Sequence, residues 1–182
     1  MLNNEFNMKN LTKGFTLIEL LIVIALLGAL AVGLLAALDP FEQLKKGTDT
    51  GVRNTVSEFH GAVVRYYAIK NQMPWCADAT CTMEAGFTED TAITLDTIPT
   101  TIENITDTGE LKTDFSTLAG DATLEKITVF GNNENATVTV CYKPTAKSFV
   151  SDPNTKFTAT TGVDDCISDP DPAVNTCLWC VK

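Results

Sequence analysis

The chain has 182 residues, with 23 Asp and Glu against 13 Lys and Arg, which gives a formal net charge of −10 at pH 7. This length suggests one domain with appendages. The acidic balance argues against a nucleic-acid-binding protein, which needs clustered lysines and arginines. We therefore predict no nucleic-acid partner for the chain and interpret most of its acidic residues as an ordinary solvated surface.

The first element in the chain is an apolar segment over residues 15–38. Of its 24 residues only Glu19 is charged, and 15 are Phe, Leu, Ile or Val. A helix of this length spans about 36 Å, more than the roughly 30 Å hydrocarbon core of a bilayer. The apolar side chains favour insertion by roughly 5–9 kcal/mol, and the glutamate costs at most about 3 kcal/mol. The sequence therefore predicts a transmembrane helix.

Two ordinary interpretations of this segment fit less well. A cleaved secretory signal would explain Lys9 and Lys13, and Ala29-Leu30-Ala31 could serve as its small-residue exit site. Its apolar core is only about 7–15 residues long, however, and this run continues past that exit. A simple membrane anchor leaves Glu19 without a role, whereas an ionisable residue inside a membrane is by default a functional-site hypothesis.

The string GFTLIELLIVIALLGALAV at residues 14–32 resembles the prepilin signature of type IV pilins and of the pseudopilins of type II secretion systems. The resemblance implies that residues 1–14 are a leader and that a prepilin peptidase cuts between Gly14 and Phe15. It also implies that the new amino group of Phe15 is methylated and that Glu19 is the fifth residue of the mature chain. The implied fold is pilin-like and α+β, with a long N-terminal helix packed on a small antiparallel sheet.

Simple electrostatics agrees with this resemblance. Cleavage would leave a charged amine on Phe15, one helical turn from Glu19. In a filament, the Phe15 amine of one subunit could pair with Glu19 of its neighbour, and such a pair is much stronger in a low-dielectric core than in water. Many pilins carry a proline in this helix, but here the first is Pro40, so any loosening on assembly is expected at Gly28, Gly33 or the step into Pro40.

Residues 39–73 are predicted to form a second, amphipathic helix. Asp39 suits its N-cap and Pro40 its first turn. Gly47 and Gly51 each cost about 1 kcal/mol relative to alanine, which predicts a bend or a frayed turn at 47–51. The helix is expected to end before Pro74. Its apolar stripe consists of Val52, Val56, Phe59, Val63 and Tyr66.

The same stretch extends the resemblance. Its pattern is similar to that of the major-pseudopilin branch of the family. The features that carry this similarity are an acidic-Pro entry, a Lys-Lys-Gly stretch, an Arg-Asn step, a Tyr-Tyr pair and a later Pro. The signature and this stretch together cover about 40% of the chain.

Residues 74–182 are predicted to form a globular head. Residues 75–125 are interpreted as loops with one short helix at 111–119. The strings KITVF and ATVTVCYK around GNNEN predict a hairpin. KSFVS and TKFTAT around DPN predict a second one. The resulting three or four antiparallel strands need a cover, which the stripe of the 39–73 helix can supply.

Six cysteines lie in the head: Cys76, Cys81, Cys141, Cys166, Cys177 and Cys180. An even number in an exported region predicts disulfides, although 15 pairings are possible. We favour 76–81 as the most local, with 166–177 and 141–180 for the remaining four. Because a Cys-x-x-Cys motif ends the chain, half of a zinc site and a redox-active pair remain alternatives.

Few other residues predict chemistry. His60 is the only histidine, and without a supporting motif it is interpreted as a partly packed residue rather than a catalytic one. The candidate calcium ligands come from the resemblance, because some pseudopilins bind calcium in a C-terminal loop: Asp164, Asp165, Asp169 and Asp171. Their spacing is not that of an EF-hand, and a solvated loop is the alternative.

These observations predict a non-enzymatic structural subunit of a type IV pilus-like filament, without a required cofactor. The alternatives are a pseudopilin that drives protein export and an anchored binding module that does not polymerise. The partners implied by the resemblance are other pilin-like subunits, the prepilin peptidase, an inner-membrane assembly platform and, before assembly, membrane lipid. The leader would stay in the cytoplasm and the head outside, first on a single-pass membrane protein and then on an extracellular or periplasmic filament.

Overall fold

The computed structural model describes residues 14–37, 39–78 and 80–182. The chain divides into two compact units, Met1–Pro40 and Phe41–Lys182. The predicted leader, apart from Gly14, and the last residue of the predicted span, Leu38, lie outside the described residues.

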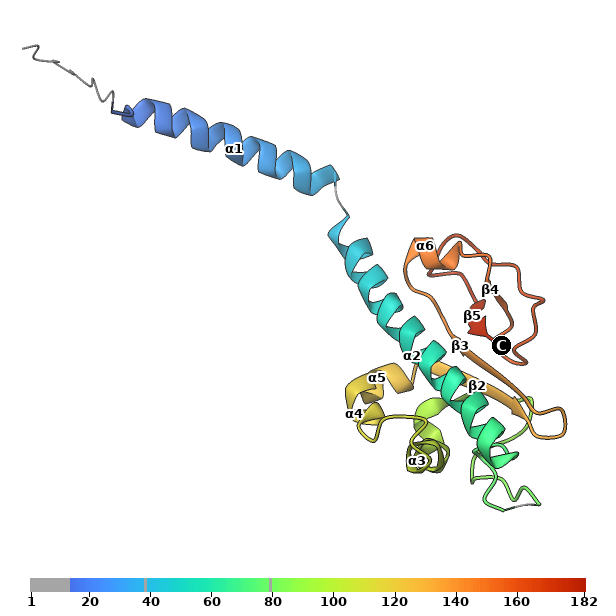
Figure 1. The fold of residues 1–182 in the computed structure, drawn as a ribbon. Helices are drawn as coiled ribbons and strands as arrows, with labels where there is room; N and C mark the ends of the chain where they lie inside the picture. The colour runs from blue at the N-terminus through green and yellow to red at the C-terminus, as the bar shows by residue number, and fades with distance from the viewer. Residues whose placement is uncertain (1–13, 38, 79) are drawn as a thin grey trace, which may run out of the picture. The chain divides into compact units, whose positions relative to one another are not determined.

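The first unit contains helix α1, Leu17–Ala37 (Figure 1). Its segment Leu17–Leu35 has a mean hydropathy of 2.8, and none of it is buried against the rest of the protein. Apolar side chains surround the helix on all sides, so no face is reserved for a soluble core. By length and composition α1 can cross a membrane.

Helix α2, Pro40–Lys70, starts at the predicted proline, and from Phe41 onward it belongs to the second unit. All five residues of the predicted stripe are buried. The buried residues of α2 are Asp49, Val52, Val56, Phe59, Ala62, Val63 and Tyr66. The frayed turn expected around Gly47 and Gly51 is wrong, because α2 continues unbroken through both. A tertiary contact explains this: the carboxylate of Asp49, between the two glycines, is hydrogen-bonded to Thr145 and Ala146 of the head.

The head is built on a five-stranded antiparallel sheet in the order β1-β2-β3-β5-β4. The strands are β1 Ile93–Thr94, β2 Ile127–Asn132, β3 Thr137–Tyr142, β4 Thr155–Phe157 and β5 Leu178–Val181. The predicted hairpin is β2–β3, with Ile127 opposite Tyr142 and Asn132 opposite Thr137. The α+β fold predicted from the sequence is therefore present, with five strands in the sheet where three or four were expected.

The two faces of the sheet have different cores. Val138, Val140 and Tyr142 alternate on one face of β3 and join the α2 stripe in the main core, with α2 passing across β2 and β3 (Figure 1). Cys141 lies on the opposite face, in a smaller cluster with Phe130 of β2 and three residues of the later strands. The period-2 pattern of the hairpin sequence thus places both faces correctly.

Residues 75–125 contain more structure than the predicted loops. The predicted short helix is α4, Phe115–Ala119, but α3 Pro99–Asp107, α5 Asp121–Leu124, the 3-10 turn η1 Leu95–Thr97 and strand β1 were missed. Helix α3 begins with Pro99 and buries Ile102 and Ile105. A distant residue caps it: the carboxylate of Glu84 accepts hydrogen bonds from the backbone of Thr100 and Thr101 at 2.7 and 2.8 Å. Such a long-range cap has no local sequence signal.

The second predicted hairpin is wrong. Residues 147–150 form the short helix α6, Lys147–Val150, and β4 pairs with β5 instead. The Asp-Pro-Asn segment does turn, because Thr155 N donates to Asp152 O at 2.8 Å and Asn154 N to the Asp152 side chain at 2.9 Å. The flank before that turn becomes helical where the Asp49 carboxylate holds the backbone N–H of Ala146.

Candidate functional site

The start of α1 contains the predicted processing and assembly residues. Leu17 is the first residue of α1, which makes Thr16 its N-cap and Glu19 its third residue. Glu19 Oε2 accepts hydrogen bonds from Thr16 N at 2.8 Å and Thr16 Oγ1 at 2.7 Å. Thr16 Oγ1 in turn accepts one from Glu19 N at 3.3 Å. This reciprocal pattern is a capping box.

The capping box gives Glu19 a role that the sequence analysis did not assign. The Thr-x-x-Glu spacing at 16–19 is the recognised signal for such a cap, and it was missed because the glutamate was considered only as a charge in a membrane. A carboxylate in the first turn also interacts favourably with the positive end of the helix dipole. An ordinary membrane anchor would therefore also have a use for Glu19, so the presence of this residue does not by itself distinguish an anchor from a pilin.

The predicted cleavage position lies just outside the cap. Gly14 and Phe15 precede the helix, and the Phe15 side chain is 81% exposed. All hydrogen bonds of the box are made by Thr16 and Glu19, so cutting between Gly14 and Phe15 leaves the helix start intact. Both side-chain contacts use Oε2, and within the described residues Oε1 of Glu19 accepts no hydrogen bond. The exposed carboxylate can therefore accept a cation from outside without losing its cap.

The six cysteines form three disulfides in the head: Cys76–Cys81, Cys141–Cys180 and Cys166–Cys177. These are the pairings that the sequence analysis favours. Cys141 and Cys180 lie directly opposite each other on β3 and β5, so this bond joins two neighbouring strands at the centre of the sheet. Cys166–Cys177 closes a loop that leads into β5.

This connectivity contradicts both alternatives for the C-terminal Cys-x-x-Cys motif. Cys177 is bonded to Cys166 and Cys180 to Cys141, so the two cysteines of the motif do not form a redox pair with each other. None of the six cysteines is free, which also removes the thiolates that a zinc site would need. A catalytic pairing of His60 with a cysteine would also lack a free thiol, because all six cysteines are in disulfides.

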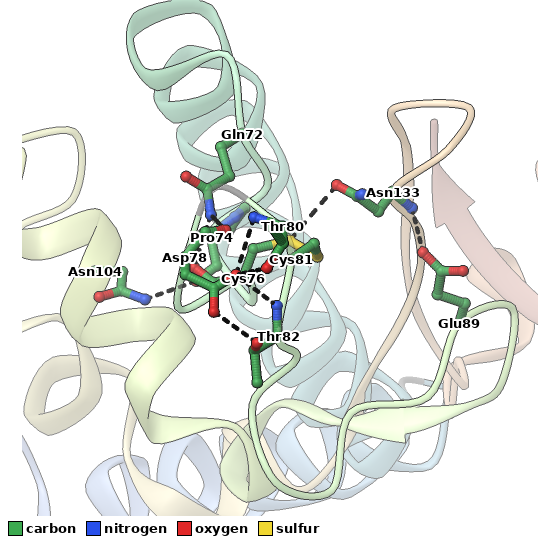
Figure 2. The surroundings of a disulfide bond; sticks show 10 residues. All are labelled: Gln72, Pro74, Cys76, Asp78, Thr80, Cys81, Thr82, Glu89, Asn104 and Asn133. Carbon is green, nitrogen blue, oxygen red and sulfur yellow. Dashed lines mark hydrogen bonds between the residues drawn. A yellow bond between two sulfur atoms is a disulfide. The ribbon is translucent and has the colours of Figure 1, made fainter.

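The Cys76–Cys81 bond closes a polar loop after α2, which Figure 2 shows. Asp78 is at its centre and accepts hydrogen bonds from Thr82 Oγ1 at 2.6 Å, Thr80 Oγ1 at 2.7 Å and both backbone N–H groups at 3.0 Å. These bonds, led by that of the Thr82 hydroxyl, hold the pKa of the Asp78 carboxyl well below its ordinary value. The carboxylate is thus an internal organiser of the loop.

The four candidate calcium ligands do not share one site. Asp164 forms an ion pair with Lys156 at 3.3 Å, which lowers the pKa of its carboxyl. Asp169 and Asp171 each accept a hydrogen bond from a backbone N–H two residues later, at 2.8 and 3.0 Å. Within the described residues no group of three or more His, Cys, Asp or Glu is placed to hold a metal. The described side chains do not form a ready calcium site, and calcium binding stays a prediction.

His60 is half-buried on the flank of α2, as the sequence analysis expects of a partly packed residue. It lines a hollow of about 630 Å³ together with Asp90, Phe130, Thr139 and Lys182. Burial lowers the pKa of its imidazole, and a hydrogen bond with the Val138 backbone acts in the opposite direction. The surroundings therefore favour the neutral ring.

The comparisons with known proteins agree with the geometry at the start of α1. Residues 9–35 match the family described as the prokaryotic N-terminal methylation motif. No curated protein and no solved structure matches the chain. The matched residues include the cleavage position, the capping box and almost all of α1. Over residues 9–35 the chain thus carries the N-terminal methylation signature of type IV pilins and pseudopilins.

Proposed function

We propose that this chain is a non-enzymatic structural subunit of a type IV pilus-like filament. A prepilin peptidase cuts it between Gly14 and Phe15, the new amino group is methylated, and α1 carries the subunit from the membrane into the filament core. The observation that supports this most is the N-terminal methylation signature at residues 9–35, which contains the cleavage position and the exposed apolar helix with its single carboxylate, Glu19.

The proposed assembly step is electrostatic. Before assembly, Glu19 lies near the membrane surface, where its cap and nearby water stabilise the charge. In a bundle of α1 helices water is excluded, and an unpaired carboxylate there would cost several kcal/mol. The Phe15 amine of an adjacent subunit supplies the missing positive charge. Because Oε1 is not used by the cap, the pair forms without unwinding the first turn.

The head is the part that the filament displays. It is acidic overall, and three disulfides join its loops and its central strands. Its partners are the pilin-like subunits around it, with the peptidase, an inner-membrane assembly platform and membrane lipid acting earlier. The head lies outside the cytoplasmic membrane throughout, first on an anchored subunit and then on the filament.

A second candidate is a pseudopilin that drives protein export. The unbroken α2, with its Asp-Pro entry at 39–40 and its Tyr-Tyr pair at 66–67, follows the pattern that favours it. Neighbouring genes distinguish the two functions, since a secretin and export set indicates a pseudopilin and a retraction ATPase indicates a pilus. The third candidate, an anchored binding module that does not polymerise, requires that Glu19 be dispensable for surface display.

Variants of the capping box test the proposal, because the cap and the charge of Glu19 can be removed separately. Glu19→Gln keeps a cap acceptor but removes the charge, since glutamine also completes a capping box. Thr16→Ala keeps the charge and the backbone bond to Glu19 but removes both bonds of the Thr16 hydroxyl, at a cost of about 1 kcal/mol. Thr16→Ser preserves both and is the matched control. Assembly is measured as subunit in sheared surface fractions of cells that contain the assembly system.

We expect Glu19→Gln to lower assembled subunit by about tenfold or more, since even 1.4 kcal/mol of lost pairing changes an equilibrium tenfold. Thr16→Ala should have a much smaller effect, and Thr16→Ser none. Normal assembly of Glu19→Gln would contradict the proposed pairing. N-terminal mass spectrometry of the same fractions should find chains that begin at methylated Phe15; uncleaved Met1 in cells with an active peptidase would contradict the processing step.

A further inference from the structure

The first two turns of α2 expose an apolar and basic surface. Phe41 and Leu44 are 74% and 69% exposed, and Lys45 beside them is exposed as well. Positions 41, 44 and 45 have the i, i+3, i+4 spacing that places side chains on one face of a helix. We call these three residues the α2 entry patch. Two large apolar side chains on a helix face next to a lysine need a partner that accepts both chemistries.

The neighbouring flank of the same turns is already occupied by the head. Glu42 Oε1 accepts a hydrogen bond from Lys147 N at 2.5 Å, and two turns further along α2 the Asp49 carboxylate accepts one from Ala146 N at 2.7 Å. These contacts fix α2 on the head through residues 42 and 49, which leaves the entry patch outside the core. They also bring the backbone of Lys147 to the start of α2, which carries Lys45 and Lys46 in its first two turns.

The covalent connection places this patch near a membrane surface. Helix α1 has 21 residues, which is about 31 Å of helix and matches a hydrocarbon core of about 30 Å. Its last residue, Ala37, therefore reaches the boundary of that core. Phe41 follows four residues later and lies at most about 14 Å of extended chain from Ala37. Whatever the angle between the two units, the first turn of α2 starts within reach of the lipid headgroups.

The charge of the patch is unusual for this protein. The chain has a net charge of −10, so its head as a whole is repelled by an anionic membrane surface. Lys45 and Lys46 of α2, with Lys147 at the start of α6, are basic residues that such a surface attracts. A helix that presents Phe and Leu beside lysines has the composition of an interfacial segment, with apolar side chains among the acyl chains and amines at the phosphates.

From this juxtaposition we propose that the α2 entry patch binds the anionic headgroup layer of the membrane before assembly, with Phe41 and Leu44 inserted at the acyl boundary and Lys45, Lys46 and Lys147 at the lipid phosphates. The inference rests on α1 spanning the membrane, as the proposed function requires. It adds that the subunit is held at two places, by α1 and by the patch. Extraction into a filament must therefore release the patch as well as the helix.

The same surface could instead be covered by a second copy of this chain. The structure favours lipid, because the patch follows the span directly. Anionic lipid can also meet the lysines in any orientation of the subunit, whereas a second copy would have to place acidic side chains opposite them. The two occupants differ in what they predict, since contact with lipid depends on bilayer composition and contact between copies depends on protein concentration.

The test uses the full chain reconstituted in vesicles of phosphatidylcholine with or without phosphatidylglycerol, with brominated acyl chains as fluorescence quenchers. Phe41→Trp reports on the patch and Leu30→Trp on the span. Ile69→Trp is the matched control, because Ile69 is also exposed, at 60%, but is about 42 Å further along α2. The native Trp75 and Trp179 are buried, at 1% and 4% exposure, and the parent chain gives their background.

We expect Leu30→Trp and Phe41→Trp to be quenched and Ile69→Trp to be unaffected. In the Phe41→Trp background, Lys45→Gln with Lys46→Gln should lower the bound-to-free ratio of the patch by about fivefold per lysine in phosphatidylglycerol vesicles, and hardly at all without that lipid. The near-UV circular dichroism of each variant shows whether the head is folded.

Three results would overturn the proposal. Quenching of Leu30→Trp without that of Phe41→Trp would leave the span and the proposed function standing and remove the patch. No quenching at Leu30 would remove both. A blue shift of Phe41→Trp that grows with protein concentration, without lipid quenching, would assign the patch to a second copy of the chain.

Discussion

Asp49 of α2 and Ala146 of the head are joined by a hydrogen bond of 2.7 Å across 97 positions of sequence. Both residues are buried. The same carboxylate also accepts from Thr145 N and Thr145 Oγ1, both at 2.8 Å. One side chain thus satisfies two backbone donors at the start of α6 and fixes the first half of α2 on the head. Buried carboxylates are uncommon without such partners.

We predict that Asp49→Ala destabilises the chain by about 3 kcal/mol, because it leaves the Ala146 N–H buried without an acceptor and removes charge-assisted hydrogen bonds. Asp49→Asn should cost less, since an amide oxygen can still accept one of these bonds. The matched control is Glu58→Ala, which removes an exposed carboxylate from the same helix. The measurement is chemical unfolding of the detergent-solubilised chain; equal midpoints for Asp49→Ala and Glu58→Ala would contradict the role assigned to Asp49.

The sequence predicts best the elements in which apolar residues recur at a regular spacing. The 3.6-residue stripe from Val52 to Tyr66 places α2, and the alternation of Val138 and Val140 with threonines places the β2–β3 hairpin. The errors occur where a distant residue decides the local structure. Asp49 organises the segment that was expected to be a strand at 147–151, and Glu84 caps a helix that was expected to be loop.

The residues of the candidate site could be named from the sequence because they are neighbours along the chain. Gly14, Phe15 and Glu19 follow from one short motif, and the Thr16–Glu19 cap has its own sequence signal. The cysteine pairing is a different case. The bond between residues 76 and 81 follows from proximity in sequence, but Cys141–Cys180 depends on β3 and β5 being neighbours, which no local pattern determines.

Two glycines should respond to alanine in opposite directions. A Cβ on Gly131 of β2 would lie 2.5 Å from the Trp75 ring and 2.9 Å from Phe87, whose rings stack with centroids 4.5 Å apart. Gly131→Ala should therefore cost about 1–3 kcal/mol by overpacking. Gly51 of α2 has nothing within 4 Å of such a Cβ, so Gly51→Ala should stabilise the isolated subunit by up to about 1 kcal/mol.

Unfolding midpoints of the two variants in the same buffer test this prediction, with Gly131→Ala below the parent chain and Gly51→Ala above it. A neutral Gly131→Ala would mean that the stacked pair can move aside. A destabilising Gly51→Ala would mean that α2 is less regular at that turn than the structure shows.

The three disulfides should rank in stability by the length of chain that each closes. Their cysteines are separated by 5, 11 and 39 positions. Loop-closure entropy then gives about 2 kcal/mol for Cys76–Cys81, about 3 for Cys166–Cys177 and about 4 for Cys141–Cys180. Replacing both cysteines of each pair with serine and measuring the unfolding free energy tests the order. A smaller loss for Cys141–Cys180 than for Cys76–Cys81 would show that chain entropy is not the main contribution.

The lowered pKa of His60 predicts a loss of stability in weak acid. Burial holds the folded-state pKa below the ordinary value of 6.5, so between the two pKa values the unfolded chain binds more protons than the folded one. The stabilising contribution of the neutral ring is therefore complete above pH about 6.5 and is lost as the pH falls through the folded-state pKa.

The acidic side chains of the protein also make stability depend on pH. The effect of His60 is therefore measured as the difference between two chains that differ only at this residue. We expect the unfolding midpoint of the parent chain to fall from pH about 7.5 to about 5.5 more steeply than that of His60→Gln, which keeps polarity but cannot be protonated there. Asp90 and Lys182 line the same hollow and remain in both chains, so the difference between the two profiles contains the titration of His60 and its interaction with these two charges. Parallel pH profiles for the two chains would show that His60 is accommodated equally well in its charged form, and that the hollow beside it admits enough water to solvate an imidazolium.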